Sequence, residues 1–571
     1  MKISKKIVSV MLVLTTVFAL FFGGACNKSK HRNDASYIEI QIYDRGYGTD
    51  GIRAVADAFM EKNTDITIGF TPVTDCTLAT DIYTGPSMVS TDLYLYGGDN
   101  LYNLVNSGSV VLEGVQYDNY FEPLNEVYEA VPEGESRSVK DKMLDSYEKY
   151  YNLKDGVKWT EDTYYTAPWI NSTTGIVYNS KMFETYGWNI PVTTDELIDT
   201  CKQIVAEDIY STNKNSEGQK IRVAPFSYCM TDSYWREVYS LWWAQYDGPV
   251  AFNNFFKGQD ADGNYTSDIA ASDGRRYMML TLDQLLGTYT KKDGTVTPRP
   301  ANEIYCDPTL CSRSYIDVQS TFMNAEEARV NTNGATTSAM MPNGDWLENE
   351  MYNNFSEDIN SGKVAFKLMK TPVISAIINH PDCESIENDE ELAALIKAID
   401  AGSKSLTGTV DDVSYDVEQK AFDKIKQARG LSLGGVRYSA YIPVFANAKD
   451  VAKEFLIFMF SDEGLKANAK ATRGQTMPFE YDYSSVEGVS AFHQSKLEIF
   501  DKTEEYVFLG DKYPAVYLGQ LNPYVMYHPI ENKFNVSSAN DYIDPTTIFV
   551  DNYDEIADAW ENIMSDSGIE W

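Results

Sequence analysis

Polar side chains able to bind a hydroxyl-rich ligand follow two short apolar runs of this chain. Tyr43 closes the first run and is followed by Asp44, which can accept hydroxyl hydrogen bonds, and Arg45, which can donate them. Tyr96 closes the second run, and Asp99 follows two glycines that would let a ligand approach the backbone. The alternatives are that Asp44 caps a turn and that Asp99 belongs to a plain turn before a helix.

Aromatic side chains form a second set of candidate contacts, because the C–H face of a sugar ring packs well against an aromatic ring. Trp346 stands at the start of an expected helix, directly after Asp345, and we expect both side chains to contact the ligand. The remaining candidates flank other expected helices and strands: Trp169, Tyr234, Trp235, Arg437 and Tyr438. The alternative for the aromatic residues is a place in the core, to which we assign Trp242 and Trp243.

These candidates need a scaffold that brings the ends of several strands together. Residues 37–43 alternate apolar and polar side chains, and residues 66–70 and 92–96 indicate two further strands. Residues 51–63 carry apolar side chains at helical spacing. This alternation of strand and helix predicts an α/β fold with a parallel sheet covered by helices. Ligands of such sheets bind at the carboxyl ends of the strands.

Three longer segments resemble one known family. Residues 174–198, TGIVYNSKMFETYGWNIPVTTDELI, indicate a strand, a short helix ended by Gly187, and a second helix opened near Thr193. Residues 338–347, SAMMPNGDWL, indicate a buried strand that leads into a helix. Residues 441–460 indicate the end of a strand and an amphipathic helix. In this order the segments resemble the lobe crossings of bacterial extracellular solute-binding proteins of the ABC-transporter type, in the sugar-binding form similar to maltose-binding protein.

The resemblance implies a periplasmic-binding-protein-like fold, in which a multi-strand hinge joins two α/β lobes with a ligand cleft between them. We expect residues 37–165 and 335–437 to form the first lobe, and residues 166–334 and 438–571 to form the second. The segment 373–431 has no counterpart in the family pattern and has no expected place on either lobe.

The function implied by the resemblance is that of a substrate-binding lipoprotein of an ABC importer. Such a protein captures a carbohydrate, here an oligosaccharide, by closure of its cleft and delivers it to the transmembrane permease subunits. We expect a monomer without a cofactor. The alternatives are a surface solute sensor, a carbohydrate-active enzyme, and a carrier of a solute other than a sugar.

The N-terminus predicts export and anchoring. Lys2, Lys5 and Lys6 precede an apolar run that is too short for a comfortable membrane span. The following Gly-Gly-Ala-Cys resembles a bacterial lipobox, in which Cys26 is acylated by a chain such as palmitate and becomes the new N-terminus. Residues 1–25 would then be a signal peptide and residues 26–36 a flexible tether that leaves the protein outside the cytoplasm, anchored to the cell membrane. The alternative is an ordinary secretory signal.

Composition excludes several other classes. The formal net charge of -36 disfavours nucleic acid, whose binding depends on neutralising phosphates. Four His and the spacing of the Cys do not fit a zinc site. Cys306 and Cys311 are close enough in sequence to form a disulfide across one loop, although free buried thiols are an equal alternative. No motif of a serine hydrolase, a zinc protease or a P-loop enzyme is present.

Overall fold

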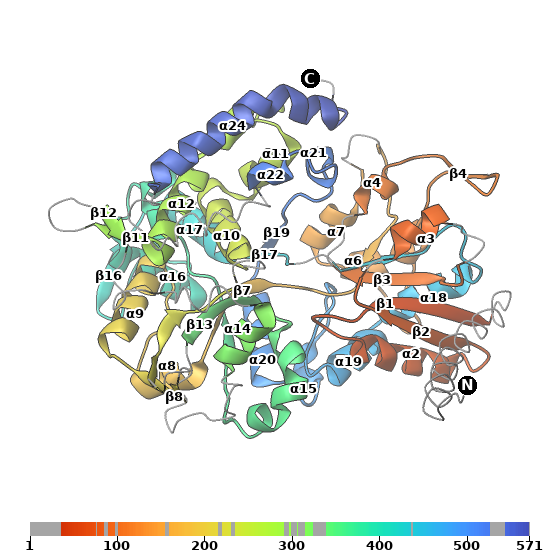
Figure 1. The fold of residues 1–571 in the computed structure, drawn as a ribbon, viewed down its shortest axis with the longest axis horizontal. Helices are drawn as coiled ribbons and strands as arrows, with labels where there is room; N and C mark the ends of the chain where they lie inside the picture. Colours follow the sequence, from red (N-terminus) through yellow and green to blue (C-terminus); the bar gives the residue numbers. More distant parts are fainter. Residues whose placement is uncertain are drawn as a thin grey trace, which may run out of the picture.

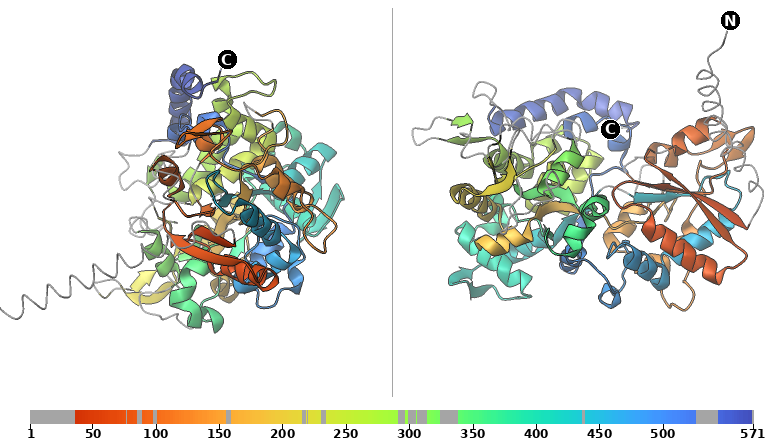
Figure 2. Two further views of the ribbon diagram at one scale, coloured as in Figure 1. Left: turned by 90° about the vertical axis from the view of Figure 1, so that its right-hand side faces the viewer. Right: turned by 60° about the horizontal axis from the view of Figure 1, so that its bottom comes forward.

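The computed structural model describes residues 36–569, apart from residues 76, 85–88, 98–100, 155–158, 215–217, 219, 230–233, 291–295, 299–304, 306–313, 324–337, 436–437 and 526–542. Two sheets form the centres of two lobes that lie side by side (Figures 1 and 2). Figure 1 shows the first lobe, which contains the N-terminal strands, on the right and the second lobe on the left. The α/β fold with two lobes predicted from the sequence is therefore confirmed.

The first lobe is built on a five-stranded sheet with the order β2-β1-β3-β18-β6. Its first three strands are parallel, whereas β18 runs antiparallel to both β3 and β6. Alternation along β1 buries Ile38, Ile40 and Ile42 completely. The strands are β1 (Tyr37–Tyr43), β2 (Thr67–Val73), β3 (Leu93–Gly97), β6 (Ala167–Pro168) and β18 (Tyr438–Tyr441), with a hairpin of β4 (Val110–Leu112) and β5 (Val115–Tyr117).

Amphipathic helices cover this sheet. On α2, Val55 and Phe59 are buried, and the Phe59 ring packs edge-on against Phe455 of α18 at 5.6 Å between ring centroids. The helices of the lobe are α2 (Asp50–Lys62), α3 (Leu78–Thr84), α4 (Tyr102–Val105), α5 (Asn125–Glu129), α6 (Val139–Lys142), α7 (Asp145–Tyr151), α18 (Lys449–Met459) and α19 (Asp462–Ala471). The lobe therefore combines an N-terminal segment with helices from late in the chain.

The second lobe is built on a four-stranded sheet with the order β10-β13-β7-β14. β13 runs parallel to β10 and antiparallel to β7, which in turn runs antiparallel to β14. Every residue of β7 and β13 is buried, so both strands lie in the interior of the lobe. The strands are β7 (Thr174–Tyr178), β10 (Ala224–Phe226), β13 (Ser338–Gly344) and β14 (Lys367–Met369).

Helices of the second lobe begin and end where the sequence predicts. Asn179 caps α8 by accepting a hydrogen bond from the Met182 N–H at 3.0 Å, and Gly187 ends α8 in the left-handed conformation with φ of 70°. Thr193 caps α9 in the same way. The larger helices that follow β7 are α8 (Ser180–Tyr186), α9 (Thr194–Ala206), α10 (Trp235–Asp247), α11 (Pro249–Lys257), α12 (Asp273–Leu286), α14 (Tyr315–Phe322), α15 (Leu347–Asn360), α16 (Asp389–Asp400), α17 (Gln419–Gly430), α20 (Ala491–Phe500) and α24 (Pro545–Asp566).

Shorter elements complete the described part of the chain. They are the two-stranded sheets β8 (Tyr210–Lys214) with β9 (Lys220–Arg222), β11 (Thr288–Thr290) with β12 (Val296–Pro298), β15 (Thr407–Val410) with β16 (Val413–Asp416), and β17 (Leu431–Leu433) with β19 (Glu505–Val507), the 3-10 helices η2 (Ser267–Ala271), η3 (Ser375–Asn379), η4 (Pro381–Cys383) and η5 (Tyr483–Ser485), and the single turns α21 (Pro514–Tyr517) and α22 (Asn522–Val525).

The chain passes between the two sheets at places that differ from those expected. It leaves β6 of the first lobe and enters β7 of the second through residues 169–173. It returns between β17 and β18, and it crosses again between α19, which packs on α2, and α20, which packs on β14. The expected positions of four strands are therefore wrong: β13 and β14 belong to the second lobe, and β6 and β18 belong to the first. A buried apolar strand carries no sequence signal for the sheet that it joins.

The segment 373–431, which the family pattern left unplaced, belongs to the second lobe. It forms α16 and α17, and their side chains Leu392, Leu395 and Ile425 are completely buried in the main hydrophobic core of that lobe. This segment therefore enlarges the second lobe.

Some sequence predictions lie outside the described residues. These are the signal peptide, the acylated Cys26, the tether as far as residue 35, and the Cys306–Cys311 pair. Among the described cysteines, Cys201, Cys229 and Cys383 are buried thiols, and burial raises the pKa of Cys383 to about 11. In the described part of the chain, no helix has the length and apolar character needed to cross a membrane.

Truncation of Phe455 tests the packing of α18 on α2. Because the side chain is completely buried, Phe455→Ala should lower the free energy of unfolding of the first lobe by about 3–5 kcal/mol. Urea denaturation followed by amide exchange in β1 and α2 measures this loss. The control is Glu454→Ala on the exposed face of the same helix, which should change stability by less than about 0.5 kcal/mol. Equal stability of the two variants would contradict the assigned packing.

Candidate functional site

Aromatic residues of the first lobe meet at the carboxyl end of β1. The Tyr43 ring, which ends β1, lies 6.1 Å from the ring of Tyr438, which begins β18. Trp169, which follows β6, packs edge-on against Tyr438 at 5.2 Å. A Cβ on Gly97 would lie 2.4 Å from the Tyr438 ring, so the glycine at the end of β3 is needed for this close approach. Three of the sequence-predicted residues are thus brought together by strand order.

The second lobe presents two aromatic residues to the same place. Tyr234 immediately precedes α10, Trp346 immediately precedes α15, and their rings lie 5.1 Å apart. Tyr47 of the first lobe joins the two sides, because its ring lies 4.9 Å from Tyr438 and 6.1 Å from Trp346. We call Tyr43, Tyr47, Tyr234, Trp346 and Tyr438 the interlobe aromatic cluster.

Two further predicted aromatic residues, Tyr96 and Trp235, are buried outside this cluster. The Tyr96 ring is buried in a separate core of the first lobe, where its hydroxyl donates to the side-chain oxygen of Gln41. Trp235 is completely buried in the core of the second lobe, 5.0 Å from Phe226. Trp235 directly follows Tyr234 in the sequence, and at the start of α10 neighbouring side chains point in different directions. The core positions expected for Trp242 and Trp243 are confirmed.

Asp345 holds the lobes together at the end of β13. Its Oδ1 accepts hydrogen bonds from the Tyr47 hydroxyl and from the Thr173 backbone N–H, the latter at 3.2 Å. Its Oδ2 forms an ion pair with the Lys496 ammonium, and both side chains are completely buried. Burial lowers the pKa of Lys496, and the Asp345 carboxylate opposes that effect. The carboxylate predicted to contact a ligand therefore has three protein partners in this conformation.

The first turn of α15 is also hydrogen-bonded to the loop that follows β1. The Asn349 side-chain amide donates to the Gly46 carbonyl at 2.6 Å. Glu350 accepts from the Gln319 side chain at 2.6 Å and has a backbone hydrogen bond with Gly46. Burial nevertheless raises the pKa of Glu350 to about 7. Sequence reasoning missed Tyr47, Asn349 and Glu350, although the position of Trp346 at the start of a helix signals that the next turn faces the same surface.

Asp44 and Arg45 lie on the solvent-exposed side of this loop. Arg45 forms an exposed ion pair with Asp75 at 3.7 Å, which adds little stability. Both side chains thus remain accessible beside the cluster. The other two predicted polar contacts, Asp99 and Arg437, lie outside the described residues. Within the described part of the chain, no group of His, Cys, Asp and Glu is arranged to hold a metal ion.

Residues 45–280 match the family model described as bacterial extracellular solute-binding protein. No curated protein matches the chain. The fold is similar to the GacH receptor of Streptomyces glaucescens, solved unliganded and with acarbose or an acarbose homolog, at 12% identity and a TM-score of 0.52 over 93% of this chain and 98% of that one.

Two other solved structures are similar to the same extent. The apo-form of RafE from Streptococcus pneumoniae has 15% identity and a TM-score of 0.51, covering 92% of this chain and 98% of its own. A protein from a study of xylan utilization by Caldanaerobius polysaccharolyticus has 13% identity and a TM-score of 0.51, covering 91% and 100%. At these identities the structures show the fold, which is that of the periplasmic binding proteins. The resemblance to bacterial extracellular solute-binding proteins is confirmed.

Substitution of Asp345 tests the junction of the lobes. Asp345→Asn leaves the Lys496 ammonium buried without a countercharge, so stability should fall by about 3–5 kcal/mol. The double variant Asp345→Asn with Lys496→Met removes the uncompensated charge and should recover a large part of this loss. Chemical denaturation of the wild type, both single variants and the double variant measures the coupling. A double variant as unstable as Asp345→Asn alone would refute the assigned pairing.

Glu350 should make stability depend on pH. Its pKa is about 7 in the folded protein and about 4.5 in the unfolded chain, so the folded state binds more protons between these values. The stabilisation is therefore complete below pH 4.5 and is lost as the pH rises through 7, by at most about 3 kcal/mol. Thermal unfolding from pH 5 to pH 8 should show a weaker pH dependence for Glu350→Gln than for the wild type. The exposed Glu357→Gln on the same helix should leave the wild-type profile unchanged.

Proposed function

We propose that the protein captures a carbohydrate between its lobes and delivers it to the permease of an ABC importer. The observation that carries this proposal is the interlobe aromatic cluster, to which both lobes contribute rings at strand ends and helix starts. The match to a solute-binding family model and the likeness in fold to a receptor solved with acarbose support the same conclusion.

The chemistry of the cluster suits a neutral, hydroxyl-rich ligand. Aromatic faces bury the C–H surface of a sugar ring, and phenol hydroxyls exchange hydrogen bonds with its hydroxyl groups. Asp44 and Arg45 stand at its solvent side, where a carboxylate and a guanidinium can bind hydroxyls directly. The strong negative charge of the chain does not oppose a neutral ligand.

Lobe closure couples binding to delivery. A ligand that contacts both lobes stabilises the closed conformation by the difference between its affinities for the closed and open states. Lobe closure would bend the chain at three hinge segments. They lie between β6 and β7, between β17 and β18, and between α19 and α20. An acyl chain on Cys26 would hold the receptor beside the membrane, within reach of the permease.

A thermal-shift screen against neutral oligosaccharides tests the proposal. A ligand present at one hundred times its Kd stabilises the fold by about 2.7 kcal/mol, which shifts the melting temperature by several degrees. Titration calorimetry of each hit then gives the affinity. The absence of any shift across maltose-, xylose- and galactose-based oligosaccharides would overturn the carbohydrate proposal and leave the fold unaffected.

Substitution of Tyr234 tests the aromatic cluster within that screen. This ring is partly exposed at the start of α10, so Tyr234→Ala should fold normally and lose roughly tenfold or more in affinity for the identified sugar. The control is Tyr186→Ala, which removes a partly exposed ring from α8, where it stacks on Trp188. Equal affinities of the two variants would exclude Tyr234 from the binding surface.

A further inference from the structure

A cavity away from the interlobe aromatic cluster is lined by residues of both lobes. Its volume is about 260 Å³, near the lower end for small-molecule pockets. Asn106, Asn152 and Trp159 line it from the first lobe, beside α4 and α7. Lys257, Gln259 and Tyr513 line it from the other side, beside α11 and α21. Figure 1 shows α21 and α11 near α4 and α7 where the two lobes meet.

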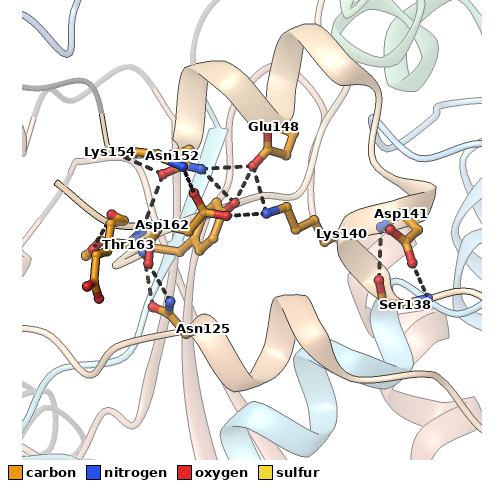
Figure 3. A network of polar contacts seen from close by, with 11 residues as sticks. Asn125, Ser138, Lys140, Asp141, Glu148, Asn152, Lys154, Asp162 and Thr163 are labelled. Atoms are coloured by element: carbon orange, nitrogen blue, oxygen red, sulfur yellow. Dashed lines mark hydrogen bonds and ion pairs between the residues drawn. The ribbon is translucent and has the colours of Figure 1, made fainter. Parts of the chain in front are cut away.

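The first-lobe wall is fixed by a polar network (Figure 3). The Asn152 amide donates to the Tyr164 hydroxyl at 2.9 Å and to Glu148 at 3.1 Å, and its oxygen accepts from the backbone N–H of Lys154 at 3.0 Å and of Thr163 at 3.3 Å. With all its hydrogen-bonding groups engaged, Asn152 shapes the wall and holds it in place.

Trp159 offers an aromatic surface on this fixed wall. Its indole N–H donates to the Asn106 side-chain oxygen at 3.3 Å, and its ring packs against Tyr165 at 5.5 Å. The side chain remains partly exposed, so one part of the ring is anchored and another faces the cavity. A pre-oriented ring of this kind binds a sugar without a large loss of side-chain entropy.

The opposite wall is positively charged. The ammonium groups of Lys257 and Lys512 each lie 5.7 Å from the centre of the Tyr513 ring. Lys512 also donates to the backbone carbonyl of Lys149, at the end of α7, at 2.7 Å. Lys257 lies in the last turn of α11 and forms no ion pair with any described carboxylate.

This charge is unusual for the chain as a whole. Acidic residues outnumber basic ones strongly enough to give a net charge of -36, yet the described residues that line the cavity include two lysines and no Asp or Glu. A carboxylate placed here would gain charge-assisted hydrogen bonds in a partly buried setting, where they are stronger than at the surface.

We propose that this cavity is an anion-selective site of the cleft that binds the carboxylate-bearing uronate residue of an oligosaccharide, with Lys257 as the carboxylate ligand and Trp159 as the stacking surface. The inference rests on the proposed function, because it names the class of sugar that the cleft prefers. Neutral sugar residues of the same ligand would occupy the interlobe aromatic cluster.

Titration calorimetry with matched neutral and acidic sugars tests this site. The probes are galactotriose with trigalacturonate, and xylotriose with its glucuronate-substituted form. In at least one pair the wild type should bind the acidic sugar at least tenfold more tightly than its neutral counterpart. Higher salt should weaken the binding of the acidic sugar and leave that of the neutral sugar unchanged.

Variants of Lys257 distinguish sugar binding in this cavity from sugar binding at the interlobe aromatic cluster. Lys257→Met should remove the preference for the acidic sugar and leave neutral binding intact, whereas Lys257→Arg should keep the preference. The control is Lys404→Met, which removes an exposed charge from the second lobe and should behave as the wild type. Melting temperatures without ligand confirm that each variant folds.

Two results would overturn the inference in different ways. Neutral sugars that bind with Tyr234-dependent affinity, without a preference for the acidic partner or without an effect of Lys257→Met, would refute the anionic site and leave the proposed function standing. Failure of every probe, acidic or neutral, to bind the wild type would refute both the anionic site and the carbohydrate function.

Discussion

The buried carboxylate of Asp345 is the interaction on which the arrangement of the two lobes depends. It accepts hydrogen bonds from a hydroxyl of the first lobe and from a backbone N–H of the crossing segment, and it forms an ion pair with an ammonium of α20 in the second lobe. A buried charge is tolerated only when such partners replace water. Because the partners come from three separate parts of the chain, the charge fixes the relation of β13 to the β1 loop and to the hinge. Trp346 follows Asp345 directly, so the same constraint positions the aromatic cluster.

The interlobe aromatic cluster shares residues with the contacts that join the two lobes. Tyr47 supplies a hydroxyl to Asp345 and a ring to Tyr438 and Trp346, which makes one side chain part of both the support and the surface. Asn349 and Glu350 then join the β1 loop to the first turn of α15. Any movement that separates the lobes must break these contacts, and a ligand bound to both lobes would add its own contacts to them.

Local features of the fold could be predicted from the sequence because they depend on neighbours in the chain. The alternation of Ile38, Ile40 and Ile42, and the caps at Asn179 and Thr193, are of this kind. The sheet joined by β13 or β18 could not be predicted, because a fully buried strand fits either lobe equally well. The expected helix start identified Tyr234 and Trp346 as candidates. It could not show that Tyr234 faces the cluster and Trp235 the core, because the two residues are adjacent and both aromatic. The partners of Asp345 depend on contacts across the hinge that leave no local pattern.

The position of β18 has a consequence for the order in which the protein folds. In the first sheet this strand lies between β3 and β6, yet Ala440 pairs with Leu95 from far earlier in the chain. The N-terminal strands therefore cannot complete their sheet until most of the second lobe, as far as β17, has been synthesised. Closing so long a loop is slow, and it leaves an open sheet edge exposed meanwhile. A chain exported in an unfolded state would be suited to this delay, since neither lobe can finish folding before its late segments arrive.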